Sequence, residues 1–300
     1  MFDSISNSWA ILKQSWGVLR KNKELTLFPI ISGIVSMLVA ATFVLPFFVV
    51  PELRHQVMAW GDQANQAAQG GGQRGIETGR IVMFVLMFLF YVTSYFVVVF
   101  FNVALVSCAV VRMSGGEPTL RDGFSAAGAR LPQILGWSVV AGTVGMILKL
   151  IEDRSDAIGR FVIGLLGLAW TVTTYLVVPI LAVEGLGPMD ALKRSAALLR
   201  HSWGEGLAGN FTMGLIGFLL CLPGAALFFI GMMVIAKIGW AAAFFVAGGV
   251  VYLMAVAIVM STLHQIFLAG VYIYAAQQRI PNGFDEELLR SAFRRKGGKR

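Results

Sequence analysis

Apolar residues along this chain gather into long stretches that contain no charged side chain. Six of them reach or exceed the ~18 residues that mark a transmembrane helix candidate. Because lipid-exposed backbone must satisfy its own hydrogen bonds, these stretches predict an all-α, polytopic membrane protein with six transmembrane helices. The stretches are Leu25–Val50, Ile81–Val111, Leu131–Leu148, Phe161–Val183, Gly206–Ala236 and Ile238 to about Ala276.

Two of these stretches are longer than a membrane requires. The second has 31 residues and the sixth has 39, so straight helices rising about 1.5 Å per residue would exceed a ~30 Å hydrocarbon core. Each is expected to tilt, bend or protrude. A turn at Gly248 and Gly249 would leave only about ten residues on one side, too few to cross. We therefore expect one helix in the sixth stretch.

Composition and charge fix the expected orientation. Of the 300 residues 57% are apolar and 13% are charged, about half the charged share of an average soluble domain. With the N-terminus inside, 17 of the 24 Lys and Arg residues fall in cytoplasmic segments. The positive-inside rule then predicts that both termini are cytoplasmic, in a bacterial inner membrane.

The net charge of +8 also indicates which molecules the protein contacts. Basic flanks and a basic tail over 281–300 favour contact with membrane lipids, in particular anionic headgroups at the cytoplasmic face. The basic residues are not gathered on a soluble domain, so no nucleic-acid partner is expected. Small residues at four-residue spacing, such as Ser138 with Gly142, permit close helix packing within a protomer or in a homo-oligomer.

An internal repeat organises the chain. Residues 3–17 align without a gap to residues 190–204, with seven of fifteen positions identical, and a weaker third copy begins at Asp122. Each copy precedes an odd-numbered span, which predicts three parallel repeats of a cytoplasmic amphipathic helix followed by a transmembrane hairpin. The expected order is a cytoplasmic helix over 1–24, a membrane domain over 25–280 with interfacial helices near 119–133 and 188–204 and an outer loop over 52–80, and the tail.

The first repeat helix carries an apolar stripe at helical spacing. The stripe consists of Phe2, Ile5, Trp9, Leu12, Trp16 and Leu19, and the second copy ends in Trp203. Tryptophan on an apolar face beside basic residues suits the headgroup boundary, so Trp9, Trp16 and Trp203 are predicted interfacial anchors. Such helices either sense lipid or, more simply, form a structural cuff beneath the bundle.

The end of the fourth stretch carries a family resemblance. Pro179 and Glu184 close it, and Pro188, Ala191, Leu192 and Ser195 follow in a Pro-x-x-Ala-Leu-x-x-Ser pattern before a Ser-Trp dipeptide. This resembles a group of poorly characterised bacterial six-helix inner-membrane proteins, related to the membrane domain fused to some glycerophosphodiester phosphodiesterases. The resemblance implies an architecture and no activity.

Catalytic and metal-binding motifs are not found in the sequence. His55, His201 and His264 form no His-Glu-x-x-His pair, and no nucleophile elbow or phosphate loop is present. We therefore expect no catalytic residues, no metal site and no cofactor. The acidic residues Glu152, Asp153 and Asp156 in a short outer loop could hold a hard cation, but a salt-bridged turn is the simpler interpretation.

Four polar residues inside the spans are the candidate site. Asn102, Asn210, His264 and Gln265 fall toward the expected cytoplasmic leaflet, where a polar side chain facing lipid is costly. They form either a polar vestibule or interhelical hydrogen bonds. The first alternative predicts a channel- or transporter-like bundle for a small solute or lipid, and the second a scaffold that binds a partner or organises lipid.

The fifth stretch contains a helix-breaking pair. Pro223 removes a backbone donor and clashes with the preceding turn, and Gly224 follows it. A kink or a full break is expected there. Broken helices often mark transport sites, although a proline kink also occurs without one.

Overall fold

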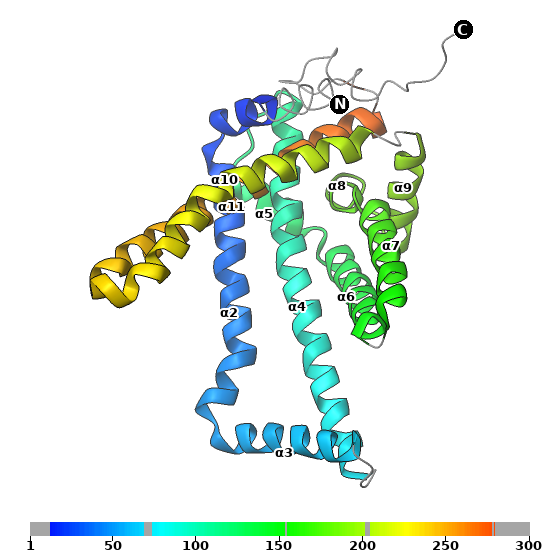
Figure 1. Cartoon of the computed structure of the whole chain (residues 1–300). Helices are drawn as coiled ribbons and strands as arrows, with labels where there is room; N and C mark the ends of the chain where they lie inside the picture. Colours follow the sequence, from blue (N-terminus) through cyan, green and yellow to red (C-terminus); the bar gives the residue numbers. More distant parts are fainter. Residues whose placement is uncertain (1–12, 69–73, 154, 202–204, 278, 280–300) are drawn as a thin grey trace. The chain divides into compact units, whose positions relative to one another are not determined.

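The computed structural model describes residues 13–68, 74–153, 155–201, 205–277 and 279, and all regular structure within them is helical (Figure 1). The described chain begins in a helix over 13–21. The helices that follow are η1 (Lys23–Thr26), α2 (Leu27–Val49), α3 (Pro51–Ala68), α4 (Arg74–Met113), α5 (Leu120–Gly128), α6 (Leu131–Asp153), α7 (Ala157–Thr173), α8 (Val177–Val183), α9 (Pro188–His201), α10 (Glu205–Ile238), η2 (Gly239–Ala241) and α11 (Ala242–Gln277).

Six helical segments of the described chain are long and apolar enough to cross a membrane. They coincide with the six stretches predicted from the sequence, so the all-α membrane class is confirmed. The sixth is the single helix α11, because the chain reverses in η2 just before it. The segments are Lys23–Val49, Ile81–Met113, Leu131–Asp153, Ile158–Val183, Met213–Val234 and Ala243–Gln277.

The chain forms two compact units, each assembled from segments that are distant in sequence. Unit 1 contains Met1–Ile30, Phe101–Arg130 and Thr171–Arg300, and unit 2 contains Ile31–Phe100 and Leu131–Trp170. Helices α2 and α4 therefore contribute to both units.

Aromatic contacts and one glycine hold unit 2 together. Phe43 of α2 meets Phe90 of α4 edge-on, with ring centroids 5.4 Å apart. The indoles of Trp137 and Trp170 stack at 5.9 Å and 12°. A Cβ on Gly142 would lie 3.2 Å from Cγ2 of Val92, which shows that α6 approaches α4 closely at this small residue.

The connection between the first two spans differs from the outer loop predicted over 52–80. Helix α3 occupies Pro51–Ala68, and α4 already begins at Arg74. The Gly-rich composition of part of this region suggested an irregular loop. However, Pro51 at the first helical position and Glu52 in the first turn are favourable helix-start residues, and the Ala and Gln residues that follow have good helix propensity.

The core of unit 1 lies around the second half of α11. Residues 265–273 of this helix are buried on every side, and residues 103–106 of α4 are fully buried as well. A helix segment that is buried all round is a core element. Phe28 and Phe124 pack with ring centroids 5.3 Å apart, and Gly123 has no room for a side chain between Phe28 and Cys108.

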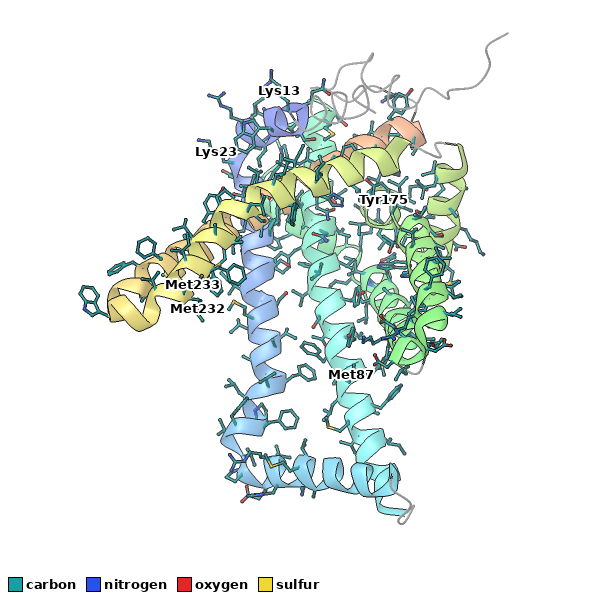
Figure 2. All side chains as sticks on the ribbon, viewed as in Figure 1. Lys13, Lys23, Met87, Tyr175, Met232 and Met233 are labelled. Carbon is teal, nitrogen blue, oxygen red and sulfur yellow. The ribbon has the colours of Figure 1, made fainter. Side chains whose placement is uncertain are left out.

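Helices α10 and α11 form an antiparallel pair with a seam of glycines (Figure 1). A Cβ on Gly217 would meet Met260, one on Gly224 would meet Tyr252 and Leu253, and one on Gly231 would meet Val246. Contacts spaced seven residues apart on both helices are typical of a left-handed helix pair. Many apolar side chains of the pair that lie away from the seam are exposed, among them Met232 and Met233 (Figure 2).

A full helix break at Pro223 is not present, and a kink, the other expected alternative, stays a prediction. Helix α10 continues through Pro223 and Gly224 from Glu205 to Ile238. A proline deletes one hydrogen bond of the ladder, which a neighbouring helix can offset by packing. The close packing is possible because Gly249 of α11 has no side chain. A Cβ on Gly249 would lie only 2.9 Å from the carbonyl oxygen of Gly224.

Helices α5 and α9 occur where interfacial helices were expected, near 119–133 and 188–204. Helix α5 begins with a capping box in which Asp122 N–H donates to the hydroxyl of Thr119 and the Asp122 carboxylate accepts from Thr119 N–H. The position of both helices relative to a lipid surface stays a prediction.

Candidate functional site at the interrupted fourth span

The fourth span is interrupted near its carboxyl end. Helix α7 ends at Thr173, α8 begins at Val177, and residues 174–176 form a turn between them. The N–H of Leu176 donates to the hydroxyl of Ser195 at 3.1 Å, so the turn is bonded to α9. Non-helical backbone at membrane depth is tolerated only where protein or water satisfies it. The interruption therefore depends on a contact from outside its own helix.

The motif that begins at Pro188 explains how α9 reaches this turn. Pro188 is the first residue of α9, and Ala191 and Ser195, one turn apart, are both fully buried. Helix α9 packs against α8. The small alanine and the hydroxyl-bearing serine thus form the face that contacts the interrupted span.

A charged network joins α8, α9 and α11. Oε1 of Glu184, which ends α8, accepts a 2.9 Å hydrogen bond from the hydroxyl of Tyr272 and a 3.2 Å bond from Nε of Arg194. Tyr272 is among the largest fully buried side chains. The side chain of Glu184 is 23% exposed and that of Arg194 is 41% exposed, so solvent screens the ion pair in part. The hydrogen bond from Tyr272 connects α11 to the end of the fourth span.

Gly185 makes room for a second arginine. Its φ of 62° is in the left-handed region, and an added Cβ would collide with the guanidinium of Arg130. A side chain at this position would be strained twice, by the backbone and by Arg130. Gly185 therefore lets the loop after α8 pass close to Arg130.

Two polar side chains lie together at the interruption. The rings of Tyr175 (labelled in Figure 2) and His264 meet edge-on with centroids 6.5 Å apart. Among the described residues the hydroxyl of Tyr175 is buried without a hydrogen-bond partner, and so is Oε1 of Gln265, the residue after His264 on α11. Buried polar atoms are nearly always paired, so each of these atoms needs a polar partner. Other described atoms of this kind are on Gln14, Ser15, Asn22 and Gln133.

The other two members of the predicted polar set belong to α4 and α10. Asn102 is half-buried on α4, beside the fully buried Val103. Within the described part of the chain no hydrogen bond links Asn102 to His264 or Gln265. Asn210 belongs to α10, but its side chain lies outside the described residues.

The predicted interfacial anchors are described only in part. Trp9 and Trp203 lie outside the described residues. Trp16 is 48% exposed, at the edge of a helical face whose Ser15, Val18 and Leu19 are buried. An exposed indole next to a buried face suits the headgroup boundary, and the interfacial assignment stays a prediction.

Residues able to bind a metal ion are not gathered within the described part of the chain. No group of three or more His, Cys, Asp or Glu side chains has a geometry that could hold an ion there. Nζ of Lys149 lies 3.3 Å from Glu152 and 3.0 Å from Asp153, so this acidic pair is engaged in salt bridges. Cys108 and Cys221 are both free thiols.

The sequence analysis did not identify several residues of this site. Glu184 and Ser195 were noted only for the motif they belong to, and Tyr175, Arg194 and Tyr272 were not considered. A carboxylate at the end of an apolar stretch demands a partner, and this signal could have led to Arg194 ten residues later. Four-residue spacing of small residues does not reveal the glycine seam, because Gly217, Gly224 and Gly231 are seven residues apart.

The fold and this site define a polytopic helical protein of membranes, with a polar group beside an interrupted span. The model of a family of unknown function, DUF6159, matches residues 81–283, more than half of the chain, and the protein belongs to that family. No curated protein matches the chain.

Proposed function

We propose that this protein is a non-enzymatic, channel- or transporter-like bundle that handles a small solute or lipid at the interrupted fourth span. The observation that carries this proposal is the Tyr175 hydroxyl, which is buried in the turn of the interrupted span, beside the ring of His264, with no hydrogen-bond partner in the part of the chain that the structure describes. Polar groups inside a membrane usually face a bundle interior or a water-filled path, and interrupted helices often form transport sites.

His264 gives the test of this proposal. Purified protein in proteoliposomes is assayed for flux of ions and of small neutral solutes against protein-free vesicles. We expect His264→Leu to change the flux, because its ring packs on Tyr175 at the interruption. His55→Leu, an identical substitution at an exposed position of α3, is the control and should leave flux unchanged.

The alternative is a scaffold that binds a partner or organises lipid. In that case the protein would add no flux to vesicles, and His264→Leu would only lower thermal stability in detergent, by about 0.5–1.5 kcal/mol for the lost aromatic contact. This combination of results would overturn the transport proposal and favour the scaffold.

We further propose a bacterial inner-membrane location with both termini cytoplasmic, on the asymmetry of Lys and Arg. The repeated helices that contain Trp9, Trp16 and Trp203 would lie at the cytoplasmic interface and contact anionic headgroups. Quenching of their fluorescence by brominated lipid at headgroup depth would support this placement. A relation to the membrane domain fused to some phosphodiesterases is proposed only on the motif around Glu184 and Pro188.

A further inference from the structure

We infer that α3 lies along the lipid surface at the end of the first span, with an apolar stripe inserted at the boundary between phospholipid headgroups and acyl chains. The lipid is recognised through apolar area and not through charge. On the proposed orientation this is the outer face of the membrane. The inference goes beyond the proposed function, because it concerns a different helix and applies to a transporter and to a scaffold alike.

Helix α3 is joined to the first span without a linker. The N–H of Val50 donates to the carbonyl oxygen of Pro46 in α2 at 3.0 Å, and the carbonyl oxygen of Val50 accepts from the N–H of Arg54 in α3 at 3.3 Å. Figure 1 shows that α3 then runs across the direction of α2. The 23 residues of α2 rise about 35 Å, enough to cross a ~30 Å hydrocarbon core. Helix α3 therefore begins at the lipid surface.

The sequence of α3 carries one apolar stripe. Leu53, Val57, Trp60, Ala64 and Ala67 recur at intervals of four and three residues, so they share one face of the helix. Among residues 51–59, the part of α3 whose side chains are described, Val57 is half-buried and every other residue is exposed. The opposite face carries Glu52, Arg54, His55, Asp62, Asn65 and Gln66.

Lipid is the occupant that fits this stripe. The last residues of α2, Phe48 and Val49, are 74% and 72% exposed, as expected of side chains that face acyl chains. The stripe continues this apolar surface along the chain. Helix α3 has one arginine against two carboxylates, so anionic headgroups add no net attraction, and apolar area is the interaction that remains.

Spin labels on single cysteines test this inference. In a full-length variant without Cys108 and Cys221, each position from 52 to 59 is labelled in vesicles of phosphatidylcholine alone. Collisions with oxygen, which concentrates in lipid, are compared with collisions with a water-soluble nickel complex. We expect the oxygen-to-nickel ratio to follow the 3.6-residue period of a helix. It should be several-fold higher at Leu53 and Val57 than at Arg54 and His55.

Two further labels give the reference values. Leu38 of α2 is 62% exposed on a span and should report lipid. The side chain of Glu117, after α4, is 92% exposed and should report water.

A matched pair of variants separates the stripe from the rest of the helix. With the label at Leu53, Val57→Asp places a charge in the stripe and should lower the ratio toward the value at Glu117. Met58→Asp makes the same change one residue later, at an exposed position outside the stripe, and should leave the ratio unchanged. Equal decreases in the two variants would overturn the role of the stripe.

The other outcomes of the scan also decide the inference. If the nickel complex reached Leu53 and Val57 as readily as Arg54 and His55, α3 would stand in water and the inference would be wrong. Few collisions with either reagent at the stripe would show that protein, such as a second copy of this chain, covers it instead of lipid. A periodic ratio that required added anionic lipid would overturn recognition through apolar area alone.

Discussion

The backbone N–H of Leu176 donates a 3.1 Å hydrogen bond to the side-chain hydroxyl of Ser195. Leu176 is the last residue of the turn that interrupts the fourth span, and Ser195 lies on the buried face of α9. Both residues are fully covered, so water cannot replace either partner. The bond therefore ties the non-helical turn to a helix that begins five residues after the end of α8.

Removing this hydroxyl should destabilise the protein. Ser195→Ala leaves the N–H of Leu176 buried without a partner, which reduces the free energy of unfolding by about 1–3 kcal/mol. Titration of the protein in mixed micelles with sodium dodecyl sulfate measures this change. Ser114→Ala is the control, because the Ser114 hydroxyl donates to the carbonyl of Val110 in the last turn of α4, at an exposed position. Equal stability of the Ser195 variant and the wild type would contradict the role of this bond.

The Tyr272 hydroxyl should also contribute to stability. Tyr272→Phe removes the 2.9 Å bond to Glu184 and leaves the carboxylate with Arg194 alone. Interhelical hydrogen bonds in membranes average ~0.6 kcal/mol and reach ~1.7 kcal/mol. A buried donor to a carboxylate belongs at the upper end of this range, so we expect a loss of about 1–2 kcal/mol.

The matched control for Tyr272→Phe is Tyr252→Phe. It removes a hydroxyl from the same helix, α11, without affecting Glu184. A loss of stability as large in the control as in Tyr272→Phe would show that the network with Glu184 is not the cause.

The sequence predicted the spans well because a transmembrane helix is a local signal. The length of each apolar stretch and its lack of charged residues are enough to predict helices such as Leu27–Val49 and Ala242–Gln277, independently of the rest of the chain. Seven-residue spacing of the α10 glycines was equally visible. The residues of α11 that these glycines contact could not be predicted from the spacing. They depend on how α10 and α11 are aligned in the hairpin, and the turn at η2 sets that alignment.

The interruption of the fourth span could not be predicted in the same way. Residues 174–176 are Thr, Tyr and Leu, with neither proline nor glycine to mark a break. The turn is stabilised by Ser195, nineteen residues away, and by burial of α8. At Pro223 the local signal for a break is strong, yet packing against α11 keeps the helix continuous. Tertiary contacts decide both positions.

Acid should weaken the start of α5. Hydrogen bonds from the N–H of Thr119 at 2.9 Å and from its hydroxyl at 2.7 Å hold the pKa of the Asp122 carboxyl below its usual value. The folded protein binds that proton less readily than the unfolded chain. The contribution to stability is therefore present above the usual pKa of about 3.9 and is lost as the pH falls through the lowered value.

Hydrogen exchange of the α5 amides measures this effect. Protection, corrected for the intrinsic exchange rate, should be constant near neutral pH and fall in the wild type as the pH is lowered from about 5 to about 2. In Asp122→Asn it should show no such step, since the amide does not titrate. A step of the same size in the variant would exclude Asp122 as its source.

The proposed orientation predicts which positions a membrane-impermeant thiol reagent can reach. In a variant without Cys108 and Cys221, single cysteines at Ser6 and Ser291 should resist the reagent in intact cells, and one at Gln66 should react. The reason is that Lys and Arg flank the cytoplasmic ends of the spans. Labelling at Ser6 or Ser291 would reverse the assignment.

Two adjacent glycines of α11 should respond oppositely to the same substitution. Gly249 is buried in the seam, where an added Cβ would lie 2.8 Å from the backbone nitrogen of Phe228 and 2.9 Å from the carbonyl oxygen of Gly224. Both contacts are with backbone, so no side chain can rotate away and the helices must separate. We expect Gly249→Ala to lower the free energy of unfolding by about 1–3 kcal/mol.

Gly248 is the control for Gly249 because only the surroundings of the two residues differ. It is exposed, and no atom lies within 4 Å of the position of its Cβ. Since alanine favours a helix by roughly 1 kcal/mol over glycine in host peptides, Gly248→Ala should be neutral or stabilising. Unfolding titrations of the two variants, each against the wild type, decide the matter. If Gly249→Ala were as stable as Gly248→Ala, α10 and α11 would not be in close contact at this seam.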